Sequence, residues 1–370
     1  MTRRVAVVVG TRPEAIKLAP VITALQDEPG VDVRTIASAQ HRELLDQTLA
    51  LFDLRADVDL DLMEADQQLA AFVARAIEGV STALAALAPD FVVVQGDTNT
   101  AMAAALAAFY LGIPVAHVEA GLRSRDRRRP FPEEINRRLV STLADLHFAP
   151  TPAARDNLLA EGVADQDIVV TGNTIVDALE SIDVRGTYDD PSLAFLHGND
   201  VPLILLTAHR RESFGPPLQR ICRAVQRIVR GHDVEVVYPV HPNPNVREVV
   251  HDALGGEPKV HLVAPVSYRD LLRLLDRAVL ALTDSGGIQE EAPSFDTPVV
   301  VLRDVTERPE VVDAGAGLLV GTGEDAIVDA VTALLDDAPR RAAMAAVPNP
   351  FGDGKAARRI VDALRTRLGA

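Results

Sequence analysis

The residues best suited to chemistry are carboxylates that directly follow apolar segments in the middle of the chain. Asp97 lies three residues after the apolar run that ends at Val94, and Glu119 directly follows the run that ends at Val118. Such carboxylates act as general acids and bases when they exchange a proton with a reacting group. Cations that would attract an anionic substrate follow them: Arg123, Arg125 and Arg127–Arg129. Carboxylates beside cations indicate an enzyme.

A third acidic site, Glu133-Glu134, opens the helix predicted after Pro132. Acids in a first helical turn are also stabilised by the helix dipole, without any catalytic role. The spacing of Ile135, Leu139 and Leu143 predicts that one apolar stripe of this helix is buried. That burial would turn Glu133 or Glu134 towards the other carboxylates, and spacing leaves open which one.

The elements around Asp97 and Glu119 form a predicted βαβ unit. Residues 91–94 and 115–118 have the composition of buried strands, and an alanine-rich helix is expected between them. Parallel strands bring their carboxyl ends to one edge of the sheet, and ligands bind at that edge. We therefore expect Asp97 and Glu119 to lie close together.

The chain begins with another strand and helix of this type. Residues 5–9 are predicted as a strand, and Pro13 suits the first position of the helix that follows. Arg12 and Lys17 lie near that helix start, where the dipole favours anions. The fingerprint G-x-G-x-x-G is absent, so a nicotinamide cofactor is not expected.

The second half repeats the α/β rhythm with its own polar strand ends. His209 and His241 each follow a predicted strand, and a third strand leads into Ser285-Gly286-Gly287 at a helix start. Free backbone N–H groups at such a start bind diphosphates. Glu291, one helical turn further, is suited to accept the two hydroxyls of a ribose. This half is predicted to bind a nucleotide.

Length and composition bound the overall organisation. At 370 residues the chain is expected to form two α/β domains, residues 1–180 and 181–351, with a C-terminal helix (352–370) packing back on the first. The formal charge of −16 disfavours nucleic acid. Apolar runs fall short of the ~20 residues of a membrane span, and the single Cys222 excludes an intramolecular disulfide. A cytoplasmic protein is expected, and the three lysines among 37 basic residues suggest a salt-adapted host.

Together these segments resemble the non-hydrolysing UDP-N-acetylglucosamine 2-epimerase family. The matching blocks span the whole chain in order: GTRPEAIKLAP, QHRELLDQ, QGDTNT, HVEAGLRS, PFPEEINR, GNTIVDAL, TAHRRESFG, YPVHPNP, DSGGIQEEAPS, RDVTERPE and NPFGDGKA. The resemblance implies a GT-B-like fold with two Rossmann-like, doubly wound domains facing a central cleft. It also implies a homodimer that needs no metal and no other cofactor. The implied reaction is reversible epimerisation of UDP-N-acetylglucosamine at C2, through elimination and re-addition of UDP.

The resemblance assigns roles to residues by motif. It makes the following the catalytic candidates: Asp97, Glu119, Glu133 and His209. It makes the following the substrate-binding candidates: Arg12, Lys17, His241, Ser285, Gly286, Gly287 and Glu291. A regulatory site for a second substrate molecule would involve Gln40, Gln68 and Arg210. Gln67 stands where bacterial members of the family tend to have arginine, which puts that regulation in doubt.

Four alternatives remain open at this stage. The substrate would be a modified sugar of the 2,3-diacetamido uronate type if the pocket shape differed. A hydrolysing epimerase would release UDP and N-acetylmannosamine, and a GT-B glycosyltransferase would need an acceptor. A nucleotide-sugar sensor would not need its carboxylates.

The role of the Arg127–Arg129 triplet is open as well. It is either a solvated surface or part of substrate closure.

Overall fold

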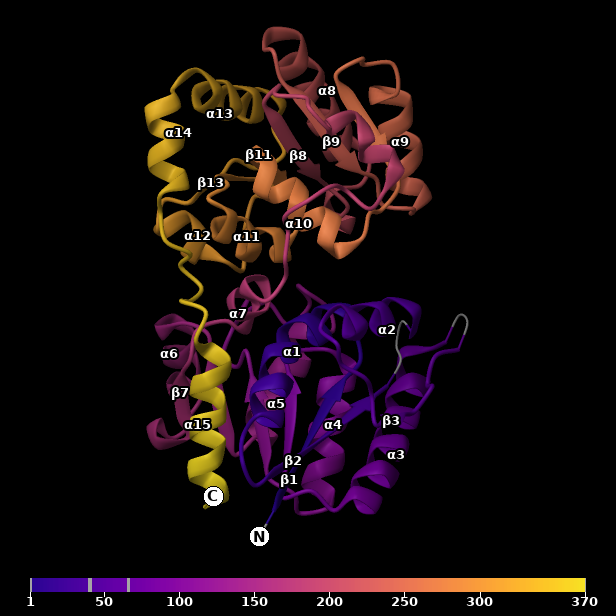
Figure 1. Cartoon of the computed structure of the whole chain (residues 1–370), viewed down its shortest axis with the longest axis vertical. Coiled ribbons are helices and arrows are strands. Elements are labelled where there is room, and N and C mark those ends of the chain that lie inside the picture. Colours follow the sequence, from indigo (N-terminus) through magenta and orange to yellow (C-terminus); the bar gives the residue numbers. More distant parts are fainter. Residues whose placement is uncertain (1, 39–41, 65–66, 370) are drawn as a thin grey trace. The chain divides into compact units, whose positions relative to one another are not determined.

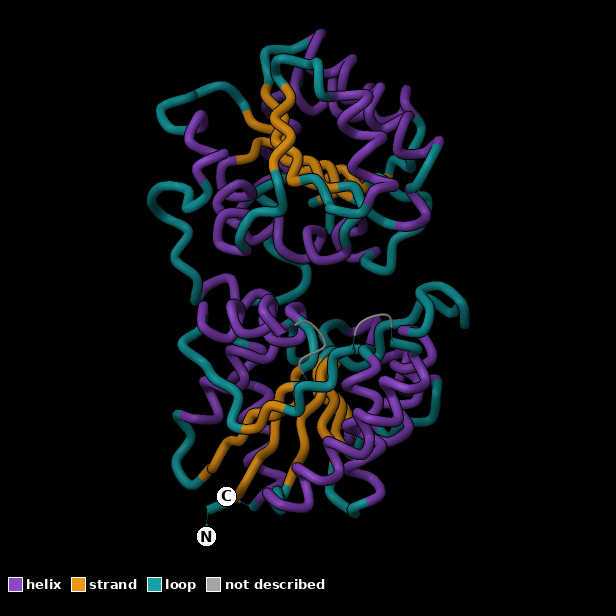
Figure 2. The backbone as a smooth tube through the Cα atoms, turned by 90° about the vertical axis from the view of Figure 1, so that its right-hand side faces the viewer, coloured by secondary structure: helices purple, strands orange, loops and turns teal. Residues whose placement is uncertain are grey.

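The computed structural model describes residues 2–38, 42–64 and 67–369, and it divides the chain into two compact units (Figure 1). Unit 1 holds Met1–Ile182 together with Phe351–Ala370, and unit 2 holds Asp183–Pro350. In each unit, helices alternate with the strands of a parallel sheet, which Figure 2 draws in orange. The predicted fold class, an α/β chain of two doubly wound units, is confirmed.

Among the described residues, unit 1 has a seven-stranded parallel sheet with the order β3-β2-β1-β4-β5-β6-β7. The first six strands follow the doubly wound order 3-2-1-4-5-6, in which the winding reverses between β1 and β4. The carboxyl ends beside this reversal are where such sheets bind ligands. The strands are β1 (Arg3–Val9), β2 (Val31–Ala37), β3 (Val58–Asp59), β4 (Phe91–Gln95), β5 (Val115–Val118), β6 (Leu146–Ala149) and β7 (Ile168–Val170).

Helices cover both faces of this sheet, because its central strands are apolar on both faces. Side chains of α1 and α15 share one core with β1, and those of α3, α4 and α5 share another. Helix α15 (Ala356–Leu368), yellow in Figure 1, comes from the C-terminus, and the carboxylate of Asp177 accepts hydrogen bonds from the backbone at its start. The other helices are α1 (Arg12–Gln26), α2 (Arg42–Leu51), α3 (Leu69–Leu87), α4 (Asn99–Tyr110), α5 (Glu133–Leu143), α6 (Pro152–Ala160), α7 (Thr174–Glu180) and the short η1 (Asp165–Asp167).

Helix α3 is, by length and composition, apolar enough to cross a membrane, with a mean hydropathy of 1.4. One of its faces carries Phe72, Ala76, Val80 and Leu84, all of which are buried against α4 and the sheet. A helix in the outer layer of an α/β sheet needs such a stripe. The burial therefore accounts for the apolar stripe of α3.

Among the described residues, unit 2 has a six-stranded parallel sheet with the order β10-β9-β8-β11-β12-β13. Counted from β8, this is again the order 3-2-1-4-5-6, with the reversal between β8 and β11. The strands are β8 (Leu203–Thr207), β9 (Glu235–Pro239), β10 (Val260–Val263), β11 (Ala278–Thr283), β12 (Val299–Val301) and β13 (Gly317–Leu319). The helices are η2 (Pro191–Leu196), η3 (Arg211–Ser213), α8 (Pro216–Gly231), α9 (Pro244–Leu254), α10 (Tyr268–Arg277), α11 (Gly286–Glu291), η4 (Ala292–Phe295), α12 (Pro309–Asp313), α13 (Glu324–Asp336) and α14 (Ala338–Ala345).

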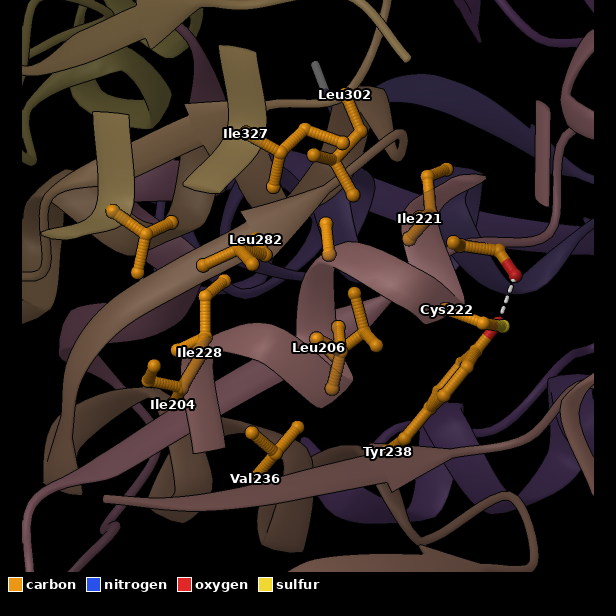
Figure 3. Packing of buried hydrophobic residues seen from close by; sticks show 14 of the residues in the cluster. Ile204, Leu206, Ile221, Cys222, Ile228, Val236, Tyr238, Leu282, Leu302 and Ile327 are labelled. Carbon is orange, nitrogen blue, oxygen red and sulfur yellow. Dashed lines mark hydrogen bonds between the residues drawn. The ribbon is translucent and has the colours of Figure 1, made fainter. Parts of the chain in front are cut away.

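The core of unit 2 packs α8 onto the sheet, as Figure 3 shows. Ile221, Cys222 and Ile228 of α8 meet strand residues such as Leu206 and Leu282. Burial raises the pKa of the Cys222 thiol to about 12, so this cysteine remains a protonated, unreactive core residue at neutral pH. It has a packing role only.

The prediction that α5 buries a stripe formed by Ile135, Leu139 and Leu143 is wrong. Leu139 is 45% exposed, whereas Glu134 and Arg137 are buried together with Val140. The charged side chains turn inwards because they pair with groups of the sheet edge and of the loop before the helix. Charge pairing has therefore overridden the apolar periodicity of this helix.

Candidate active site

Arg137 of α5 joins the two carboxylates of the unit 1 edge. Asp97 follows β4 and Glu119 follows β5, and these two strands are neighbours in the sheet. The Nη2 group of Arg137 donates a hydrogen bond to Oδ2 of Asp97, and its Nη1 donates to the backbone carbonyl of Glu119 at 2.8 Å. The same Nη2 lies 3.6 Å from Oε1 of Glu119. The structure thus brings the two carboxylates together at one guanidinium.

Glu119 is held by two further donors. Its Oε2 accepts hydrogen bonds from Nζ of Lys17 and, at 3.0 Å, from Nε2 of Gln95. The side chains of Glu119 and Lys17 are 5% and 10% exposed. The backbone of Glu119 has a φ of 61°, in the left-handed region that L-residues seldom adopt. Such conformations persist where the surroundings hold them firmly, and they cluster at active sites.

The turn that carries Asp97 is fixed through its backbone as well. The side-chain amide of Asn136 donates to the carbonyl of Asp97 at 3.0 Å. Thr98 caps α4, and its hydroxyl donates to Glu14 at 2.6 Å. Because Glu14 also accepts from the backbone N–H groups of Gly10 and Thr11, it connects this turn to the start of α1. Asp97 itself keeps a quarter of its side chain exposed, so it is accessible to a ligand.

The carboxyl group of Glu14 is buried, and this burial raises its pKa from 4.5 to about 7 despite the hydrogen bonds that lower it. A carboxyl group with a raised pKa stabilises the folded protein most at low pH, below its ordinary value of 4.5. That contribution is lost as the pH rises through about 7.

We therefore expect Glu14→Gln to remove one pH-dependent component of stability. The free energy of unfolding of the wild type, measured relative to the variant, should fall by about 3 kcal/mol as the pH rises from 4.5 to above 7. Urea denaturation of both proteins over this range measures the difference. A difference that is constant with pH would contradict the burial argument.

The structure distinguishes the two glutamates at the start of α5. Glu134 is 3% exposed, and its Oε2 accepts from the backbone N–H of Ser124 at 2.9 Å. Its other oxygen accepts from Arg138 at 2.9 Å. Glu134 therefore anchors the loop before the helix. Glu133 is half-buried at the first position of α5, which leaves it as the third catalytic candidate.

The remaining candidates of unit 1 lie around this edge. Arg12 is the first residue of α1. Arg127–Arg129 are exposed in a turn closed by a bridge between Asp126 and Arg129. Of the regulatory candidates, Gln40 lies outside the described residues, and Gln68 is an exposed residue at the start of α3. The neighbouring Gln67 accepts a hydrogen bond from Arg75 at 2.5 Å.

In unit 2, the carboxylate of Asp284 organises the loop after β8. Asp284 is fully buried and accepts from the backbone N–H groups of His209 and Arg210, each at 2.9 Å. The hydroxyl of Tyr238 donates to the carbonyl of Ala208, the contact drawn as a dashed line in Figure 3. Strands β8 and β11 are neighbours at the winding reversal, so the loop lies where a doubly wound sheet binds its ligand.

Two histidines lie together at this edge. The rings of His209 and His241 are stacked with centroids 5.5 Å apart and planes inclined by 13°. Nδ1 of His209 lies 3.8 Å from the Asp284 carboxylate, and the side chain is 39% exposed. Nδ1 of His241 accepts from the backbone N–H of Asn243 at 3.2 Å. His209 can therefore present its other nitrogen to a ligand.

The glycine turn after β11 is flanked by an arginine and a glutamate. Ser285 precedes α11, and a Cβ atom on Gly286 would lie 3.2 Å from Cζ of Arg308. The guanidinium of Arg308 therefore packs against the start of this helix, while its Nε donates to Glu290 at 2.8 Å. Glu291 accepts from the hydroxyl of Tyr268 at 3.1 Å, and its Oε1 lies 3.6 Å from a Cβ position on Gly287.

Sequence reasoning missed several residues that hold the candidates. Arg137, Gln95 and Asn136 contact Asp97 or Glu119, and Arg308 packs on the glycine turn. Each stands inside or beside a quoted motif, but nothing in the spacing shows its direction. In the described part of the chain, no group of three or more His, Cys, Asp or Glu side chains is arranged to hold a metal ion.

Comparison with known proteins agrees with the motifs. The family model described as UDP-N-acetylglucosamine 2-epimerase matches residues 23–365. The UDP-N-acetylglucosamine 2-epimerase of Escherichia coli K12 is 49% identical over 98% of each chain. A structure of a putative UDP-N-acetylglucosamine 2-epimerase from Listeria monocytogenes superposes with a TM-score of 0.93 at 46% identity, covering 100% of this chain and 97% of that one. The enzyme from Neisseria meningitidis bound to UDP-GlcNAc gives a TM-score of 0.90 at 42% identity, covering 98% and 100%. The chain therefore belongs to the UDP-N-acetylglucosamine 2-epimerase family of enzymes, as its motifs predicted.

Proposed function

We propose that this protein interconverts UDP-N-acetylglucosamine and UDP-N-acetylmannosamine without hydrolysis. The observation that carries the proposal is the unit 1 edge, where Arg137 bridges Asp97 and Glu119 beside Lys17. Family membership, and the substrate named for the Neisseria structure, support the same substrate here.

The chemistry explains why carboxylates are needed. The hydrogen at C2 of the sugar is not next to a carbonyl group, so its direct removal as a proton would be too slow. We propose that the bond from C1 to the UDP oxygen breaks as a carboxylate takes the C2 proton, which gives 2-acetamidoglucal and UDP. UDP then returns to C1 while a proton is delivered to C2 from the opposite face. Asp97, Glu119 and Glu133 supply the acid and base groups.

The unit 2 edge is suited to the nucleotide part of the substrate. We propose that the backbone of Ser285, Gly286 and Gly287 binds the diphosphate, as free N–H groups at a helix start do. Glu291 would accept the hydroxyls of the ribose. His209 would act on the departing phosphate oxygen, because its ring stacks on His241 and its backbone N–H is held by Asp284. Donors at a leaving group stabilise the charge that develops there.

The other assignments complete the proposal. Arg12, Lys17 and His241 contact the diphosphate or the sugar. Elimination and re-addition of UDP move only a proton and the UDP group, so the proposed route needs no hydride carrier and no other cofactor. A cytoplasmic location fits a nucleotide-sugar substrate.

The apolar side chains of Phe109, Tyr110 and Leu139 are 45–68% exposed on α4 and α5. Exposed apolar side chains support the proposal of a homodimer that buries them. The molecular mass of the protein in solution tests it.

Proton NMR of UDP-N-acetylglucosamine with the pure protein in D2O and high salt tests the function. We expect UDP-N-acetylmannosamine with deuterium at C2, without any added cofactor. Free N-acetylmannosamine with UDP would instead identify a hydrolysing epimerase. An unchanged spectrum with folded protein would overturn the proposal, and a 2,3-diacetamido uronate substrate would then be the next one to assay.

A further inference from the structure

His117 is a buried polar residue on a strand that is otherwise apolar. It lies on β5, opposite Val94 of β4 and His147 of β6, and none of its surface is exposed. Its Nε2 lies 2.7 Å from the carbonyl oxygen of Gly96. A carbonyl oxygen only accepts, so Nε2 carries the hydrogen and donates it. Burying an imidazole costs free energy, and this one contacts the turn that carries Asp97.

Both backbone polar groups of Gly96 form hydrogen bonds with residues of β5. Its N–H donates to the carbonyl of Val118 at 3.0 Å, and its carbonyl accepts from His117. The φ of Gly96 is +71°, in the left-handed region, so the turn requires a glycine and has little stiffness of its own. Its direction therefore depends on these hydrogen bonds as well as on those that Asn136 and Thr98 make on the far side of Asp97.

Asp97 and Glu119 are joined from two directions. On one side Arg137 bridges the Asp97 carboxylate and the Glu119 backbone. On the other side His117, two residues before Glu119, reaches across to the residue before Asp97. Two groups that act on opposite faces of one sugar ring must keep a constant separation, and a displacement of 1 Å can cost 10²-fold in rate.

We propose that His117 is a positioning residue of the proton-transfer site: its Nε2–H sets the Gly96-Asp97 turn, and with it the separation between Asp97 and Glu119. The inference rests on the proposed 2-epimerase function and adds a residue to it.

The imidazole does this as a neutral group. Burial lowers the pKa of His117 well below its ordinary value, and the nearby charge of Arg137 on α5 lowers it further, as do His147 on β6 and Arg123 in the loop after β5. The hydrogen bond to Gly96 opposes these effects without reversing them. His117 therefore takes no proton in the working pH range, and its contribution to the rate does not change with pH.

The experiment compares His117→Leu with His117→Gln in the epimerisation assay. Leucine removes the donor, and we expect kcat to fall about 10²-fold while KM changes less than about threefold. Glutamine places an N–H donor at nearly the same distance from the backbone as Nε2, so it should restore most of kcat. The pH profile of kcat/KM should be the same for the wild type and His117→Gln.

His147 provides a matched control. It is the strand partner of His117, is 2% exposed and has a pKa lowered by burial to about 4. None of the hydrogen bonds found in the described residues joins it to the Asp97 turn. We expect both leucine variants to lower the melting temperature, whereas His147→Leu should keep kcat.

Three outcomes separate the possibilities. Wild-type kcat in His117→Leu would overturn the inference. Equal loss in His117→Gln and His117→Leu would also overturn it, because the imidazole itself would then be required. If His117→Leu does not fold, His117→Asn replaces it, since asparagine is one bond too short to reach Gly96. A wild-type protein without epimerase activity would refute the proposed function before this test applies.

Discussion

Replacing Glu119 by glutamine is expected to lower kcat for epimerisation about 10³-fold, the range that a single general acid or base contributes. The amide keeps the shape of the side chain and can still accept from Lys17, but it cannot exchange a proton with C2. KM should change little, because the nucleotide groups of unit 2 are untouched. Steady-state kinetics by NMR or by coupled assay, with both epimers as starting substrate, measures the effect.

Deuterium isotope effects, measured separately with each C2-deuterated epimer as substrate, extend this prediction. If Glu119 removes the proton from one epimer only, Glu119→Gln should show a primary deuterium effect with that C2-deuterated epimer and a smaller effect with the other. Asp97→Asn should show the converse. This comparison would decide which carboxylate is the base for which epimer.

Glu134→Gln is the matched control for the Glu119 variant. Glu134 is as buried as Glu119, but its carboxylate binds Ser124 in the loop before α5 and Arg138 within this helix. We expect this variant to lose stability and to keep kcat within about threefold, since a group that only anchors a loop does not take part in the proton transfer. Unchanged kcat in Glu119→Gln, or a large loss in Glu134→Gln, would refute the assignment of these two residues.

The second large effect is expected for Arg137→Met. Methionine fills much of the same space but leaves Asp97 and Glu119 without the guanidinium that joins them. Loss of one member of a buried ion pair destabilises a protein by about 3–5 kcal/mol. The lower end applies here, because Lys17 still pairs with Glu119. We expect kcat to fall about 10²-fold as well, through displacement of Asp97.

Arg137→Lys and Arg138→Met test this explanation. Lysine restores the charge but not the fork of N–H donors that contacts two groups at once, so stability should recover more than kcat. Arg138 is the next residue on α5 and pairs with Glu134, with its side chain 39% exposed. Its replacement should cost about 1 kcal/mol or less and leave kcat unchanged. If Arg137→Met and Arg138→Met lost the same free energy of unfolding in urea and the same factor in kcat, a special role for Arg137 would be contradicted.

Much of the fold could be predicted because its signals are local. The central strands are continuous apolar runs, and turn residues separate them from helices, so their α/β order is visible in the sequence. Short elements such as β3 (Val58–Asp59) and β13 (Gly317–Leu319) were not anticipated, because two or three residues have no period. The stripe on α5 failed for a different reason, since Arg137 and Glu134 also pair with groups outside this helix, on Asp97, Glu119 and Ser124.

The sequence by itself determined the strand-end positions of Asp97, Glu119 and His209 and, through its motifs, the family of the chain. Position after a strand is a local property, and parallel pairing then brings such residues to one edge. Only the tertiary structure decided the partners: Arg137 between the carboxylates, Glu134 as a loop anchor and His117 behind the Asp97 turn. The direction of a side chain depends on burial and charge pairing with residues 10 to 40 positions away. No pattern within a single segment of sequence contains that information.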